Sequence, residues 1–123
     1  MLNLERRARK PSLLACLGGL LAAAAVGLSA YASHGVAEPL AQSHLNTAAM
    51  FAFGHGVALA VLGRTQQNSV GKLALYGLLL GTVLFSGSLV AGVLWGASTA
   101  LAPVGGTLLM VAWLGYGLNA LRR

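Results

Sequence analysis

The sequence predicts an all-α, polytopic membrane protein with four transmembrane helices in a compact bundle and both termini in the cytoplasm. Three observations predict it. The chain contains four long apolar stretches, 57% of its residues are hydrophobic, and only 8% are charged. The third is that basic residues lie at alternate connections, as expected when positive segments stay on the cytoplasmic side. These residues are Arg6, Arg7, Arg9 and Lys10 before the first stretch, Arg64 and Lys72 beside the second connection, and Arg122 and Arg123 at the end.

Composition bounds the class of protein. A chain of 123 residues has the length of one domain. Its charged fraction is far below the roughly 25% typical of soluble domains, so it could not cover a water-facing surface. The net charge of +6 does not indicate nucleic-acid binding, because the basic residues lie at span ends without a base-reading motif. Cys16 is the only cysteine, which leaves no partner for a disulfide within the chain.

The predicted elements follow in order. A basic segment, 1–12, precedes spans at about 13–32, 40–62, 73–94 and 103–121, and a basic end, 122–123, follows. About 20 apolar residues in a helix cross the hydrocarbon core, and none of the four spans contains Asp, Glu, Lys or Arg. Pro39 and Pro103 suit first-turn positions of helices. An alternative for the first span is a cleavable signal ending at 30–32, but its apolar run is long for a signal core.

Small residues recur at helical spacing in two spans. Since apolar burial does not drive helices together in lipid, close backbone approach has to contribute. We expect both stripes to pack inside the bundle, with a homo-oligomeric contact as the alternative. The stripes are Gly77, Gly81, Ser88, Gly92 and Gly96 in the third span, and Gly19, Ala23 and Gly27 in the first.

The second span carries unusual polar residues. In a continuous helix His44 and His55 share one face, and His55 lies well inside the hydrocarbon zone. A buried imidazole is expected to be neutral and to need a hydrogen-bond partner. Three interpretations remain open for His55: a structural hydrogen bond to another helix, a substrate or proton path, and contact with haem or a quinone. The candidate partners on the neighbouring spans are Ser86, Ser88 and Thr107.

Metal binding and catalysis are not predicted. His44 and His55 are separated by about 16 Å along a helix and cannot share one ion. His34, in the outer connection, approaches His44 at best, and the remote Glu38 adds little. No spacing suggests a nucleophile–base pair or a phosphate-binding loop. We therefore predict neither an enzyme nor a resident cofactor.

Several strings occur in a characteristic order. They are 32–35 (Ala-Ser-His-Gly), 51–59 around His55, 84–89 around Ser86, 102–109 and Trp113-Leu114. Together they resemble the YgdD-like family of small membrane proteins, which includes transmembrane protein 256 and is catalogued as being of unknown function. The resemblance covers roughly residues 13–121. It implies a four-helix membrane protein and draws attention to His34, Gly35, His55, Ser86 and the turn containing Pro103, Gly105, Gly106 and Thr107.

The sequence departs from the resemblance in one place. Members of the family often carry basic or amide side chains just before the histidine of the second span, where this chain has Ala49, Met50 and Ala52. If those groups form a site in the family, part of it is missing here.

The functional hypothesis is a scaffold or accessory subunit that packs against other membrane helices in the bacterial inner membrane. Its expected partners are the lipid bilayer and other membrane-protein subunits, or further copies of the chain, and nucleic acid is not among them. The alternatives are a small transporter, channel or proton path using His55 and the polar face of the second span, and a haem- or quinone-contacting subunit.

Overall fold

The computed structural model describes residues 10–66 and 68–122. They form four helices, α2 (Leu13–His34), α3 (Pro39–Thr65), α4 (Ser69–Trp95) and α5 (Leu101–Asn119), and the described ranges contain no strand. All four helices are long and apolar enough to cross a membrane. The predicted all-α membrane fold is confirmed. The predictions for Arg6, Arg7, Arg9 and Arg123 lie outside the described residues.

The helices are longer at several ends than the apolar runs that predicted them. α3 continues to Thr65 rather than 62, and α4 begins at Ser69 rather than 73. Arg64 and Lys72 therefore lie in the terminal turns of two helices. The reason is local capping: the Asn68 side chain accepts hydrogen bonds from the amides of Val70 and Gly71, which starts α4 in polar sequence. An apolar run marks the hydrocarbon zone, whereas the caps mark the helix.

The second helix is continuous. α3 runs without interruption for 27 residues, through both glycines that flank His55. At about 1.5 Å per residue it is roughly 40 Å long and reaches from one headgroup layer to the other. Pro39 occupies its first turn, as predicted.

α2 and α3 form a hairpin built on close backbone contact. A Cβ added to Gly18 would lie 2.6 Å from the Gly56 carbonyl oxygen, and one added to Gly56 would lie 2.7 Å from the Gly18 carbonyl oxygen. At the end of the hairpin where α2 begins, the Ser12 hydroxyl donates a 3.0 Å hydrogen bond to the Gly63 carbonyl. The backbone of α2 therefore occupies the space beside Gly56, the residue that follows His55.

α4 and α5 form the second hairpin in the same manner. A Cβ on Gly81 would lie 3.1 Å from the Gly105 carbonyl oxygen. A Cβ on Gly77 would lie 3.0 Å from the Cβ atom of Ala112. Part of the predicted stripe on the third span thus packs inside the bundle. At its end, Gly96 has φ 67°, a left-handed conformation that glycine adopts without strain, and it terminates α4.

The stripe predicted on the first span does not pack inside the bundle. A Cβ added to Gly19 or Gly27 would meet nothing within 4 Å, and Ala23 is exposed. The inward face of α2 contains Gly18 instead, next to Gly19, and Ala25, two residues from both Ala23 and Gly27. A helix turns by about 100° per residue, so spacing alone identified a stripe but not the direction in which it faces.

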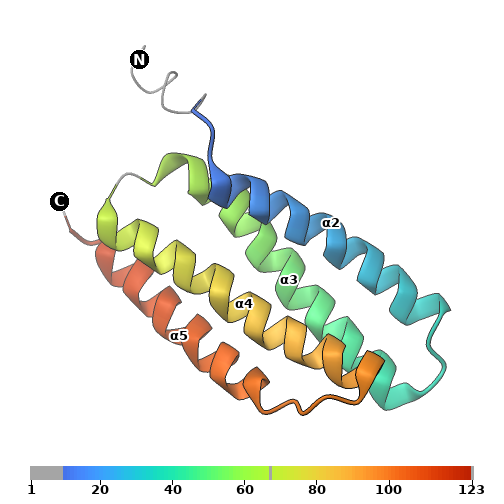
Figure 1. The fold of residues 1–123 in the computed structure, drawn as a ribbon. Helices are drawn as coiled ribbons and strands as arrows, with labels where there is room; N and C mark the ends of the chain where they lie inside the picture. Colours follow the sequence, from blue (N-terminus) through green and yellow to red (C-terminus); the bar gives the residue numbers. More distant parts are fainter. Residues whose placement is uncertain (1–9, 67, 123) are drawn as a thin grey trace.

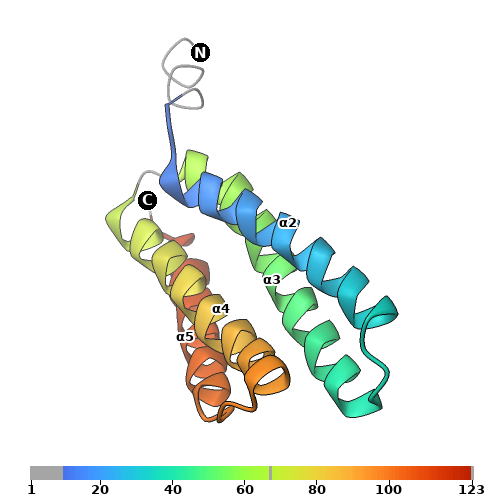
Figure 2. The same cartoon turned by 45° about the vertical axis from the view of Figure 1, so that its right-hand side comes forward.

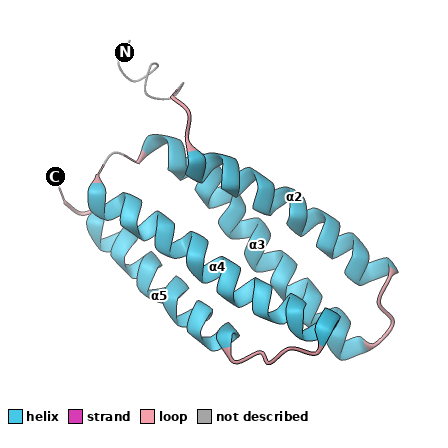
Figure 3. Ribbon diagram, in the orientation of Figure 1, coloured by secondary structure: helices cyan, strands magenta, loops and turns pink. Residues whose placement is uncertain are grey.

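The two hairpins pack through α3 and α4 (Figure 2), around Leu45, Leu59, Leu75, Leu78 and Thr82, whose side chains are fully buried. Within the described ranges, no Cα atom of α3 lies within 8 Å of a Cα atom of α5. Side chains alone bridge that space. The chain order and the helix ends place the start of α2, the end of α3, the start of α4 and the end of α5 at one end of the bundle (Figures 1 and 3).

Candidate functional site

His55 lies between α3 and α5, where the two helices are bridged by side chains. Its Nδ1 is 2.8 Å from the Phe51 carbonyl oxygen, one turn earlier in α3. Its Nε2 accepts a 2.9 Å hydrogen bond from the indole Nε1–H of Trp113 on α5. The imidazole therefore connects the two hairpins directly.

These two contacts determine the tautomer of the ring. An indole nitrogen can only donate, so Nε2 of His55 has to be the bare acceptor. Nδ1 then carries the proton, and its N–H donates a hydrogen bond to the Phe51 carbonyl. In this arrangement both ring nitrogens have a hydrogen-bond partner inside the span.

Aromatic rings surround this connection. The Phe51 ring stacks on His55 with a centroid distance of 6.0 Å, and Phe51 and Phe85 are 4.6 Å apart. The Trp113 ring lies 5.8 Å from His55. Phe51, His55 and Trp113 border an open groove of about 480 Å³ between α3 and α5, which is apolar apart from His55 and Trp113. It is lined by Phe51, His55, Gly106, Leu109, Met110, Trp113 and Leu114.

The predicted partners of His55 were wrong. Ser86 is buried and donates a 2.8 Å hydrogen bond to the Ala48 carbonyl, which ties α4 to α3. Thr107 is exposed and donates to the Pro103 carbonyl of its own helix at 2.9 Å. Ser88 is buried, and its hydroxyl has no partner among the described residues. Hydroxyls in a helix readily bond to a backbone carbonyl, which leaves the imidazole to the strongest remaining donor.

The turn containing Pro103, Gly105, Gly106 and Thr107 is part of a helix. All four residues lie in the first two turns of α5. Gly105 is buried against α4, where an added Cβ would overlap the backbone of Phe85. A Cβ added to Gly106 would lie 3.7 Å from the Phe85 ring, an ordinary van der Waals contact, and Gly106 lines the groove beside His55. The role of this turn is therefore close packing of α5 on α4.

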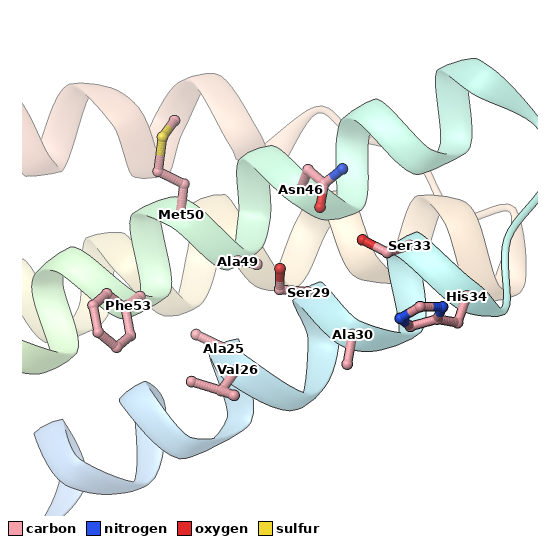
Figure 4. Close-up of a pocket in the computed structure, with 10 residues that line it drawn as sticks. All are labelled: Ala25, Val26, Ser29, Ala30, Ser33, His34, Asn46, Ala49, Met50 and Phe53. Carbon is pink, nitrogen blue, oxygen red and sulfur yellow. The ribbon is translucent and has the colours of Figure 1, made fainter.

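The other predicted residues lie at the far end of the molecule, away from His55. His34 closes α2 and lines a second groove of about 450 Å³ between α2 and α3. Figure 4 shows Ser29, Ser33, His34 and Asn46 gathered in one part of this groove, with Val26 and Phe53 further along it. Gly35 ends α2, where its amide donates to the Tyr31 carbonyl at 2.7 Å.

Glu38 caps α3 at the same end. Its carboxylate accepts hydrogen bonds from the amides of Ala41 at 2.7 Å and Leu40 at 3.0 Å. These amides lower the pKa of the Glu38 carboxyl below its ordinary value, and the charge of nearby His44 lowers it slightly more. His44 is thus electrostatically linked to Glu38, not to His55.

The metal-ligating side chains of the described residues do not gather at one centre. No three His, Cys, Asp or Glu side chains within them are grouped closely enough to hold a metal ion. Asn46 and His55 also line different grooves, one shared with α2 and the other with α5. Nine residues of helix turn through about 900°, which places Asn46 and His55 on opposite faces of α3, so the two side chains do not share one polar face.

Sequence reasoning missed Trp113 as the partner of His55. A signal was present: Trp113 lies in the middle of a span, where its N–H cannot reach water and requires an acceptor. An imidazole nitrogen on a neighbouring span is such an acceptor. The contact of Gly18 with Gly56 was missed because Gly18 and Gly19 are adjacent and spacing alone favoured the second of them.

Comparisons with known proteins place the chain among small membrane proteins. The family model described as a protein of unknown function, DUF423, matches residues 28–106. A UPF0382 membrane protein of Haemophilus influenzae is 37% identical over 102 residues, covering 75% of this chain and 82% of the relative. A UPF0382 membrane protein of Staphylococcus saprophyticus is 34% identical over 109 residues, covering 80% and 88%. No solved structure matches. The expectation of a small membrane-protein family of unknown function is confirmed.

Proposed function

We propose that this chain, which belongs to the DUF423 family of membrane proteins of unknown function, is a non-enzymatic accessory subunit that packs against helices of a partner protein in the bacterial inner membrane. One observation carries the proposal. α2 presents a second stripe of small residues, Gly19, Ala23 and Gly27, that faces away from its own bundle.

Small residues already hold helices together within this molecule. Both of its hairpins are held by glycines that let two backbones approach closely, at Gly18 with Gly56 and at Gly81 with Gly105. In lipid, this close approach and the dispersion contacts it permits favour association between helices. The outward stripe on α2 likewise consists of glycine and alanine, at four-residue spacing. We infer that its occupant is a transmembrane helix of another membrane protein.

The state of the polar groups supports packing over transport or haem binding. Both nitrogens of His55 are engaged, so an axial bond to haem iron would first require the bond to Trp113 to break. A proton path would end at Trp113, because an indole donates but does not accept. Transport and haem binding therefore stay predictions, with less support than helix packing.

The test uses the native cysteine. Cys16 is exposed and lies three residues before Gly19, on the same face of α2. In intact membranes, a short thiol- and amine-reactive crosslinker on Cys16 should capture one defined partner. Gly19→Leu and Gly27→Leu should reduce the yield several-fold. Gly54→Leu is the matched control, since Gly54 also has open space beside it but lies on α3.

Two outcomes would count against the proposal. Capture that is unchanged in Gly19→Leu and Gly27→Leu would show that the stripe is not the contact. A product consisting only of two copies of this chain, joined through Cys16, would replace the accessory subunit by a homo-oligomer.

A further inference from the structure

The open groove between α2 and α3 has a polar end and an apolar end (Figure 4). Its volume is about 450 Å³, and its polar end lies where α2 stops and α3 starts. Among the described residues that line it, none is Lys, Arg, Asp or Glu. The polar end contains Ser29, Ser33, His34 and Asn46, and the apolar end contains Ala25, Val26, Met50 and Phe53.

The polar end of this groove contains hydrogen-bonding groups without partners. Ser29, Ser33 and Asn46 are exposed, and none of them makes a hydrogen bond within the described part of the chain. Other hydroxyls of the bundle donate to a carbonyl of their own helix, as Thr82 does to Leu78 at 2.7 Å. The two serine hydroxyls and the Asn46 amide together offer four N–H or O–H donors on one side of the molecule.

These groups lie inside the predicted hydrocarbon zone. At about 1.5 Å per residue, Ser29 is about 7 Å from the end of α2, and Asn46 is about 10 Å from the start of α3. Because α3 is about 10 Å longer than the roughly 30 Å hydrocarbon core, a centred α3 extends about 5 Å beyond the core at each end. Asn46 is then about 5 Å inside the core, where an unpaired amide is costly.

We propose that this groove binds diacylglycerol, an uncharged glycerolipid with a free hydroxyl group, from the leaflet at this end of the bundle. The two ester carbonyls of the lipid accept hydrogen bonds from the Asn46 amide and from the hydroxyls of Ser29 and Ser33. The lipid hydroxyl donates to the Asn46 carbonyl oxygen, and one acyl chain follows the apolar end of the groove towards the middle of the membrane.

The groove matches this lipid in orientation, length and charge. Its polar end lies near the headgroup layer, and from His34 back to Ala25 it extends about 14 Å, which is half of the hydrocarbon core and fits one leaflet. A phospholipid would bring a phosphate for which the groove provides no Lys or Arg. The site is separate from the outward stripe of α2, because Gly19, Ala23 and Gly27 do not line the groove.

The experiment measures lipid binding to the full-length chain in neutral detergent by native mass spectrometry. The probes are dioleoylglycerol, dioleoylphosphatidylcholine and 1,2-dioleoyl-3-acetylglycerol, in which an acetyl group caps the hydroxyl. We expect dioleoylglycerol to bind most tightly. Asn46→Leu should weaken its binding about three- to ten-fold, as the loss of one or two hydrogen bonds in lipid implies. Thr47→Val is the matched control, because it removes a hydroxyl at the same depth without lining the groove.

The shape of the groove is tested separately with two alanines of α2. Ala24 and Ala30 are both exposed, so a larger side chain at either position costs no packing inside the bundle. Only Ala30 lines the groove. Ala30→Phe should therefore reduce binding of dioleoylglycerol, and Ala24→Phe should leave it unchanged, at equal helicity of both variants.

Four results would each contradict the proposal. Equal binding of dioleoylglycerol and its acetylated form would remove the role of the hydroxyl. Equal weakening by Asn46→Leu and Thr47→Val would indicate a general effect of surface polarity. Unchanged binding in Ala30→Phe would place the lipid elsewhere. Loss of Cys16 crosslinking to a partner in Asn46→Leu, with no binding of dioleoylglycerol, would assign the groove to a partner helix.

Discussion

At the scale of the residue, the most informative group is His55. A neutral imidazole has one donor and one acceptor, and this fold supplies a partner for each: the Phe51 carbonyl and the Trp113 indole. A polar side chain that would be expensive in lipid thus becomes a link between helices whose backbones do not touch. The sequence identified the residue and the need for a partner. It could not identify the partner, because that depends on how α5 is rotated.

The His55–Trp113 bond should be measurable in a double-mutant cycle. We expect Trp113→Phe and His55→Leu each to destabilise the protein, with a coupling free energy of about 0.6–1.7 kcal/mol, the range of hydrogen bonds between membrane helices. The free energy of unfolding in mixed micelles provides the measurement. Coupling indistinguishable from zero would mean that the two side chains do not interact.

Glu38 should make the stability of α3 depend on pH. Its folded pKa is lowered by the amides that it caps, so its contribution to stability is present above the unfolded pKa of about 4.3. That contribution is lost as the pH falls through the lower folded value. Thermal unfolding of wild type and Glu38→Gln in neutral detergent, between neutral pH and pH 3, measures the difference. We expect the two curves to converge in acid, and a constant difference at every pH would contradict the capping role.

At the scale of the element, glycine determines how the helices pair. Gly105 lets the backbone of α5 lie directly on that of α4, whereas a Cβ at its neighbour Gly106 would make only an ordinary contact with the Phe85 ring. Adjacent identical residues therefore have different functions in the same helix. Helical spacing predicted small-residue contacts on the third span correctly and chose the wrong face on the first, because which stripe faces inward is decided by the neighbouring helices.

This asymmetry predicts the outcome of a matched pair of substitutions. Gly105→Ala should lower the free energy of unfolding by about 1–3 kcal/mol, because the added methyl group forces α4 and α5 apart. Gly106→Ala should be neutral or slightly stabilising, since alanine favours helix and the nearest side-chain atom can accommodate it. Equal effects of both variants, measured by unfolding in mixed micelles, would show that the α4–α5 contact is looser than described.

At the scale of the whole molecule, two hairpins side by side place Lys10, Arg64, Lys72 and Arg122 at one end and Glu38 at the other. The positive end is predicted to be cytoplasmic. The charge asymmetry and the fold agree on which segments share a side.

Thiol labelling in intact cells tests this orientation. In a Cys16→Ser background, Ser98→Cys between α4 and α5 should react with a membrane-impermeant maleimide from outside. Ser69→Cys at the start of α4 should react only after the cells are opened. The reverse pattern would invert the topology.

The sequence by itself determined that this chain is a four-helix membrane protein, where its spans lie to within a few residues, and which end is basic. These properties follow from the transfer of side chains and charges between water and lipid, which depends on composition and position along the chain. The tertiary structure was needed to show that Trp113 pairs with His55 and that Gly18 rather than Gly19 faces α3. These features depend on the rotation of each helix about its axis, and that rotation is set by contacts between residues far apart in the chain.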